Sequence, residues 1–214
     1  MYAATQLSSV DLRCNVNATH TPDVLDVYAG EEVTWHVPYT ISHPGPLMGY
    51  LARAPGGGLW GWGGGRGEGD VWFKIYEDFP TWYTETYQNG YIAHSVRWPN
   101  LDLSTLPIPL PPTLPPGEYL FRIEHIGLQT ATDPTLGAQF FVSCAQIRVL
   151  PPINPQTTIQ NHGVGGIPGP LVSIPGLYLP TDEDLKVNVY GVNETTYLNE
   201  PYMTRTPGPA IWKG

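Results

Sequence analysis

Two segments that alternate apolar and polar residues most strongly limit what this 214-residue chain can fold into. Residues 117–128 (GEYLFRIEHIGL) and 138–150 (AQFFVSCAQIRVL) place apolar side chains at every second position over most of their length. This period is typical of a β-strand, because successive side chains of a strand point to opposite faces of its sheet. We therefore expect two long strands in the second half of the chain.

Other stretches have the composition of shorter strands or of loops. Three segments predict further strands: 46–54, 70–77 and 184–192. Residues 23–37 alternate on both sides of Ala29-Gly30, which predicts a hairpin or a tight strand-turn-strand unit. Proline-rich stretches at 107–116 and 150–155 predict loops.

The composition favours the same fold class. Glycine and proline number 24 each, and only 14% of the residues are charged. Many turn-forming residues and few charges are typical of short strands joined by long ordered loops. The sequence predicts an all-β fold, an antiparallel β-sandwich with long loops, in a single domain that spans residues 1–214.

The net charge of −9 argues against a nucleic-acid partner, because such partners require a basic surface that displaces counterions. A neutral polymer such as a polysaccharide is compatible with this charge, since aromatic side chains stack on sugar rings without any charge. The sequence contains no apolar run long enough to span a membrane, and we expect no membrane partner.

The cysteines and glycosylation sequons indicate a cellular compartment. Cys14 and Cys144, together with sequons at Asn17 and Asn193, suggest a secreted protein with one disulfide. Two buried free thiols in a cytosolic protein are the alternative. The first twenty residues have neither the basic start nor the apolar centre of a signal peptide, so we expect none in this chain.

Eight motifs follow one another from about residue 8 to the C-terminus: SSVDLRCN, AGEEVTWHV, SHPGPLMGYLARAP, GDVWFKIYED, PPGEYLFRIEHIGL, GAQFFVSCAQIRV, VSIPGLYLPTDEDLKVNVY and PGPAIW. In this order and spacing they resemble the fungal copper-dependent lytic polysaccharide monooxygenases of auxiliary-activity family nine, formerly glycoside hydrolase family 61. The resemblance implies an immunoglobulin-like or fibronectin-like sandwich with a flat face for cellulose. It also implies a Cys14–Cys144 disulfide.

The same resemblance implies a reaction and its partners. The family cleaves cellulose or a related β-1,4-glucan by removing hydrogen from C1 or C4 of a glucose ring. It uses one copper ion and an external electron donor. A secreted, monomeric oxidoreductase is therefore expected.

In this family two histidines hold the copper ion. One is the N-terminal residue of the mature protein, and the other lies on an H-x-G-P turn. His43, in SHPGP, occupies the second position, where the Pro-Gly-Pro turn would aim its ring at the metal. The N-terminal histidine supplies its amino group and a ring nitrogen, and the second histidine supplies a third nitrogen. These three ligands suit both oxidation states of copper and leave positions open for an oxygen species.

Other positions around the expected copper site match the family or differ from it. Gln139 matches the family's glutamine, Gln129 stands where a histidine is usual, and Phe141 stands where an axial tyrosine is usual. A glutamine amide can hydrogen-bond an oxygen species but cannot carry a proton. His125 is the alternative candidate for the missing histidine. Tyr197 and Tyr202 are the candidate substrate-binding residues near the C-terminus.

The largest difference from the family lies at the start of the chain. Several tens of residues, beginning with the bracing histidine, precede the DxRCN motif in the family, whereas MYAATQLSSV precedes it here. We expect this chain to lack the usual N-terminal strand and bracing histidine. A lone imidazole forms no chelate, so copper affinity should fall by orders of magnitude and the chain as given should be inactive.

Three interpretations follow from these observations. The chain can represent an incomplete gene model of a secreted copper enzyme. It can represent a non-catalytic relative that binds polysaccharide or another surface without the histidine brace. The third interpretation is an unrelated β-sandwich binding domain. A hydrolase with two carboxylates is disfavoured, because Asp and Glu are sparse and none of Glu118, Glu124 or Asp133 has a partner at a recognisable spacing.

Overall fold

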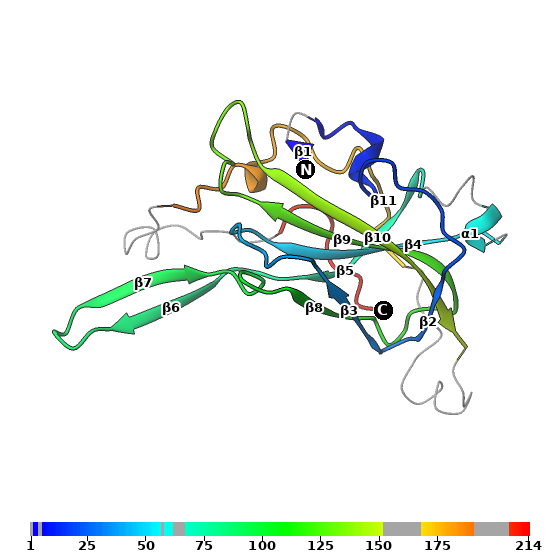
Figure 1. Ribbon diagram of the computed structural model, residues 1–214, viewed down its shortest axis with the longest axis horizontal. Helices are drawn as coiled ribbons and strands as arrows, with labels where there is room; N and C mark the ends of the chain where they lie inside the picture. Colours follow the sequence, from blue (N-terminus) through cyan, green and yellow to red (C-terminus); the bar gives the residue numbers. More distant parts are fainter. Residues whose placement is uncertain (1, 4–5, 57, 62–66, 152–167, 191–205) are drawn as a thin grey trace.

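The computed structural model describes residues 2–3, 6–56, 58–61, 67–151, 168–190 and 206–214. These residues are almost entirely strands and loops (Figure 1). The strands are β1 (Tyr2–Ala3), β2 (Leu25–Tyr28), β3 (Glu32–His36), β4 (Leu47–Arg53), β5 (Asp70–Glu77), β6 (Thr81–Thr86), β7 (Ile92–Arg97), β8 (Thr105–Pro109), β9 (Gly117–Gly127), β10 (Gln139–Leu150) and β11 (Val172–Ser173). The helical segments are short: η2 (Val10–Leu12), α1 (Gly58–Gly61) and η3 (Glu183–Leu185).

A sheet of seven strands forms the centre of the molecule. Its order is β1-β10-β9-β4-β5-β11, with β2 also paired to β10. The long β9–β10 pair runs antiparallel from Gly127 opposite Gln139 to Gly117 opposite Val149. All pairs of this sheet are antiparallel except β2–β10, which is parallel. Two smaller sheets, β3–β8 and β6–β7, complete the fold, and the β6–β7 hairpin extends away from the body (Figure 1).

The β3–β8 sheet covers one face of the seven-stranded sheet. Alternate side chains of β4, β5, β9 and β10 meet those of β3 and β8 in an apolar core that includes Val33, Leu51, Phe73, Leu106, Ile108, Phe121 and Ile147. Trp35 packs edge-on against Phe121, with 5.4 Å between ring centroids. Two sheets with an apolar core between them make a β-sandwich, so the predicted fold class is confirmed.

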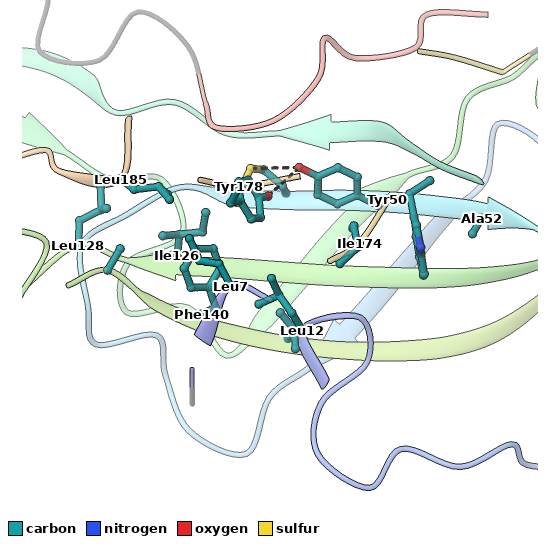
Figure 2. Packing of buried hydrophobic residues seen from close by; sticks show 14 of the residues in the cluster. Leu7, Leu12, Tyr50, Ala52, Ile126, Leu128, Phe140, Ile174, Tyr178 and Leu185 are labelled. Carbon is teal, nitrogen blue, oxygen red and sulfur yellow. Dashed lines mark hydrogen bonds between the residues drawn. The ribbon is translucent and has the colours of Figure 1, made fainter. Parts of the chain in front are cut away.

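The opposite face of the large sheet is covered by irregular chain rather than by another sheet. The N-terminal region and the segment 168–190 pack on this face (Figure 2). Together with the sheet they form an apolar cluster that includes Leu7, Leu12, Tyr50, Trp72, Phe140, Ile174, Tyr178 and Leu185. The Tyr50 and Tyr178 hydroxyls are 3.1 Å apart inside this cluster. Long loops therefore supply the second core of the molecule.

A buried ion pair lies within this second core. Arg122 and Glu124 are both fully buried and hydrogen-bonded to each other, and the Tyr178 hydroxyl donates to Glu124. Arg122 also donates to the carbonyls of Leu12 and Arg13, each at 2.9 Å. Burial alone would lower the pKa of Arg122, but the adjacent carboxylate of Glu124 raises it. The guanidinium therefore stays charged inside the protein.

Part of the stretch predicted as a proline-rich loop, 107–116, is a strand. β8 contains Pro107 and Pro109, which lie opposite Thr34 and Glu32 of β3. Proline lacks an amide hydrogen and is tolerated in edge strands, where half of the backbone groups have no partner strand. Among the described residues β8 pairs with β3 alone, so the prolines are compatible with it.

One of the two alternatives predicted for residues 23–37 is confirmed, and one further strand prediction needs correction. Residues 23–37 form a strand-turn-strand unit and not a hairpin, because β2 pairs with β10 while β3 pairs with β8. The strand predicted over 184–192 is wrong for residues 184–190, which contain only the end of η3 and irregular chain. The β6–β7 hairpin was not predicted.

The expected disulfide is present. Cys14 and Cys144 are bonded to each other, with their Cα atoms 5.0 Å apart, so the alternative of two free thiols is excluded. The bridge ties the segment after η2 to the middle of β10. Among the residues that the structure describes, no helix has the length and apolar character needed to cross a membrane.

Candidate functional site

His43 lies on a turn that joins the end of β3 to the start of β4. The turn follows the end of β9 closely, because Leu128 N–H donates to Pro44 O at 2.8 Å and Ile126 N–H donates to Pro46 O at 3.1 Å. Gly45 has φ +153°, and a Cβ there would lie 1.8 Å from the carbonyl oxygen of Ile126. Only glycine fits this close approach, so the Pro-Gly-Pro sequence fixes the path of the chain beside His43.

The side chains predicted to surround His43 converge on Gly127, the last residue of β9. A Cβ built on Gly127 would lie 2.7 Å from Gln129 Oε1 and 3.2 Å from both His43 Cβ and Phe141 Cε2. The rings of His43 and Phe141 pack with 5.7 Å between centroids. Glycine at this position therefore leaves room for three side chains from separate parts of the chain.

Gln139 is linked to this group through Gln129. Gln129 Nε2 donates to Gln139 Oε1 at 2.6 Å, and both side chains are half-buried. The Gln129 Oε1 atom is buried, and no hydrogen-bond partner for it lies within the described residues. Gln139 lies opposite Gly127 on one side and opposite Ala3 of β1 on the other. The structure thus brings together His43, Gln129, Gln139 and Phe141.

His125 is more buried than His43 and also packs against Phe141. Its ring centroid is 5.8 Å from that of Phe141, and only 7% of the residue is exposed. Burial lowers the pKa of His125 to about 4, and neither ring nitrogen has a hydrogen-bond partner within the described residues. The imidazole is therefore neutral near pH 7. A buried neutral ring does not exchange protons with solvent easily, which makes His125 a poor replacement for the histidine missing at Gln129.

Two buried polar residues that we did not predict also contact the His43 turn. Asn100 Nδ2 donates to Gly45 O at 2.9 Å and to Asp78 Oδ2 at 2.8 Å. Leu47 N–H donates to Asp78 Oδ1 at 2.7 Å. Burial raises the pKa of Asp78 to about 6, although the hydrogen bonds from Leu47 and Asn100 lower it in part. A sequence gives little warning of such residues, because their partners are backbone groups brought near by the fold.

The pKa of Asp78 predicts a pH-dependent stability. An unfolded aspartate titrates near pH 4, whereas Asp78 titrates at about 6 in the folded protein, so its stabilising contribution is complete below pH 4 and declines as pH rises through 6. Asp78→Asn removes this titration. From pH 4 to pH 7 the unfolding free energy of the native protein should fall by about 2–3 kcal/mol relative to the variant.

Urea denaturation followed by tryptophan fluorescence at several pH values measures this difference. Asp26→Asn, at an exposed aspartate, is the control. The difference in unfolding free energy between Asp26→Asn and the native protein should change little from pH 4 to pH 7. A difference between Asp78→Asn and the native protein that stays constant from pH 4 to pH 7 would contradict the prediction.

The remaining predicted site residues lie elsewhere. Tyr197, Tyr202 and Asn193 are outside the described residues. Asn17 is exposed on a turn with φ +56°, on the same side of the protein as the Cys14–Cys144 disulfide, and a sugar chain can reach it.

The donor set of the described residues does not complete a copper site. His43 supplies one imidazole, Phe141 supplies no donor atom, and the Gln139 Oε1 atom already accepts a hydrogen bond from Gln129. Within the described ranges, no group of three or more His, Cys, Asp or Glu side chains is placed to hold a metal ion. Copper prefers nitrogen donors that hold it as a chelate, and of the two described histidines that pack on Phe141 only His43 is not buried.

Comparison with known proteins identifies the family. The model of Auxiliary Activity family 9, formerly GH61, matches residues 2–197. The chain belongs to this family. It is 38% identical to the AA9 family lytic polysaccharide monooxygenase C of Emericella nidulans. The aligned 211 residues cover 97% of this chain and 78% of the relative. The chain is 39% identical to monooxygenase H of Malbranchea cinnamomea, over 98% of this chain and 79% of the relative.

Solved structures of AA9 proteins have the same fold. The extended catalytic domain of LPMO9A from H. jecorina superimposes with a TM-score of 0.70 at 25% identity, covering all of this chain and 74% of the other. A cellulose-active polysaccharide monooxygenase from M. thermophila superimposes with a TM-score of 0.69 at 24% identity, covering all of this chain and 83% of the other. AA9 proteins are secreted, copper-dependent enzymes that oxidise polysaccharides.

Proposed function

We propose that this AA9 chain acts on cellulose or a related β-1,4-glucan, and that it cleaves the glucan by oxidation at C1 or C4 when its copper site is complete. The observation that carries the proposal is the convergence of His43, Phe141 and Gln129 on Gly127, at one end of the β9–β10 pair. His43 would be a copper ligand, and Phe141 would cover one side of its ring. Copper would supply activation of dioxygen or peroxide after reduction by an external donor.

The two glutamines would act on what binds beside His43. Gln139 is half-buried, and its amide NH₂ can donate to an oxygen-containing ligand. Gln129 keeps the Gln139 amide in one orientation by donating to its Oε1 atom. Neither amide can transfer a proton, so these residues would orient a ligand without acting as general acid or base.

The remaining partners follow from the family and from the surface of the chain. We propose a secreted monomer that carries sugar at Asn17 and Asn193 and binds glucan in part through Tyr197 and Tyr202. The cellulose-active neighbour supports the choice of substrate. The disulfide and the exposed Asn17 support secretion.

A second candidate function is polysaccharide binding without catalysis. The specific observation in its favour is the donor set, because the described residues supply a single imidazole and place a glutamine amide at position 129. Such a protein would bind glucan and would need no metal.

One assay separates the two functions. The chain is incubated with phosphoric-acid-swollen cellulose, copper, ascorbate and hydrogen peroxide, and soluble products are analysed by mass spectrometry while bound protein is measured by pull-down. Oligosaccharides oxidised at C1 or C4, absent in His43→Ala, support the enzyme. Bound protein with no oxidised products supports the second candidate. Neither binding nor products would contradict both.

Copper titration tests the donor set directly. Calorimetry on the 214-residue chain should detect no tight copper site, because an isolated imidazole binds copper orders of magnitude more weakly than a chelate of several nitrogens. His43→Ala should remove the main part of the weak binding that remains. The control is His36→Ala, which deletes an exposed histidine in β3. Tight binding by the native chain, or equal losses in the two variants, would contradict the prediction.

A further inference from the structure

The turn that carries His43 is held by two side chains that the proposed chemistry does not use. Asp78 is 8% exposed and Asn100 is 1% exposed, so both make their hydrogen bonds inside the protein. Asp78 N–H donates to Leu47 O at 3.0 Å, and Leu47 N–H donates back to Asp78 Oδ1 at 2.7 Å. This reciprocal pair anchors the chain four residues after His43.

Asn100 extends the anchor to within two residues of His43. Its Nδ2 atom uses one hydrogen for Asp78 Oδ2 and the other for Gly45 O. Gly45 is the residue whose backbone also lies against Ile126 of β9. The Gly45–Pro46 peptide, two residues after His43, is therefore fixed from β9 and from Asn100, which leaves it little freedom to rotate.

The same two residues close the base of the β6–β7 hairpin. Asp78 follows β5 and precedes β6, while Asn100 follows β7. The hydrogen bond between them joins the two ends of the hairpin. The hairpin base and the His43 turn thus share one set of buried hydrogen bonds.

We propose that Asp78 and Asn100 are positioning residues, which set the direction of the His43 ring through the backbone of Gly45. The proposal rests on the proposed function only because His43 is taken as the metal ligand there. An amide at position 100 is required, since a carboxylate cannot donate to Gly45 O. Loss of that donor leaves the Gly45 carbonyl buried without a partner, which favours rotation of the Gly45–Pro46 peptide and a change in the path of the turn that carries His43.

Two substitutions separate positioning from simple stability. Asn100→Asp removes both donated hydrogen bonds and places two carboxylates together. The double variant Asp78→Asn with Asn100→Asp restores an amide–carboxylate hydrogen bond and keeps an acceptor for Leu47 N–H, but it still lacks the donor to Gly45 O. The double variant should therefore regain stability and should not regain the native direction of His43.

The readout is the ring signal of His43 in NMR spectra of the full chain with labelled histidines, assigned with His43→Gln. The chain has six histidines, and the four other than His43 and His125 report on general loosening, because His125 lies against the same turn. We expect the His43 signals to shift or split in both variants, while the urea midpoint recovers in the double variant. The control is Ile147→Val, a buried position near the far end of β10, which should lower stability and leave His43 unchanged.

Several results would overturn the proposal. These are unchanged His43 signals in the folded double variant, recovery of the His43 signals together with stability, and an equal shift of His43 in Ile147→Val. Failure of the double variant to fold would assign the bond to Gly45 a role in stability and would also overturn it. No copper or glucan enters the measurement, so a failure of the proposed oxidation leaves its result unaffected.

Discussion

Glu124→Gln is expected to lower the free energy of unfolding by about 3–5 kcal/mol, because it leaves the guanidinium of Arg122 buried without its counter-charge. Both side chains have no exposed surface, so water cannot replace the lost carboxylate. Tyr178 also loses its charged acceptor, although the glutamine Oε1 atom can still accept one hydrogen bond. Urea denaturation followed by circular dichroism measures the loss.

A surface pair on the same sheet provides the control for this prediction. Asp26 and Arg148 are 3.1 Å apart, but their side chains are about half exposed. Water screens such a pair, and Asp26→Asn should cost no more than about 1 kcal/mol. Equal losses in Glu124→Gln and Asp26→Asn would show that burial does not control the strength of the Arg122–Glu124 pair.

Replacing both cysteines by serine is expected to lower the free energy of unfolding by about 4 kcal/mol. The bridge joins residues separated by 130 positions, so its loss greatly increases the number of conformations open to the unfolded chain. The expected measurement is a large decrease in the urea midpoint of Cys14→Ser with Cys144→Ser, and a similar decrease for the native protein in reductant.

The neighbouring residue in β10 supplies a matched substitution. Ala145→Ser places a hydroxyl on the same strand, at a half-buried position next to Cys144, without touching the bridge. Its effect should be small compared with the loss of the disulfide. A double cysteine variant as stable as Ala145→Ser would refute the assigned role of the bridge.

The strands predicted correctly are those in which the sequence pattern reports directly on burial. In β9 and β10, one set of alternate side chains faces the core under β3–β8 and the other set faces Leu12 and Tyr178. Both sets are apolar over much of their length, and the alternation is still visible because Arg122 and Glu124 interrupt only one of them. Arg122 and Glu124 distinguish the face that packs against Leu12 and Tyr178 from the other face, although the sequence did not reveal that this pair is buried.

The pattern misled where apolar side chains pack without strand pairing. Val187 and Val189 are spaced as in a strand and pack against the second core, but their backbone pairs with no described strand. The opposite error is a pair of strands that is present but was not predicted, the β6–β7 hairpin. Asn89-Gly90 within an alternating segment is a strong hairpin signal. In the structure Gly90 N–H donates to Tyr87 O at 2.9 Å, and Gly90 has a positive φ of +80°.

One part of the candidate site could be predicted from the sequence, and another part could not. The Pro-Gly-Pro sequence restricts the local backbone strongly, so the turn beside His43 could be predicted from the sequence. Asp78 and Asn100 contact that turn across gaps of 31 and 55 residues. No local pattern specifies such contacts, because the partners are main-chain groups available at every position.

The prolines of β8 also determine what can join the sandwich at that side. Leu110 N–H donates to Glu31 O. In this antiparallel pair the backbone N–H and C=O groups of the even-numbered β8 residues therefore point toward β3, and the backbone nitrogens of Pro107 and Pro109 point outward. At Pro107 and Pro109 the outer rim therefore presents carbonyl acceptors without the matching donors, and an incoming strand could form only part of a ladder there. The protein thus limits self-assembly through this rim by its covalent structure, without needing charged residues to repel a second copy.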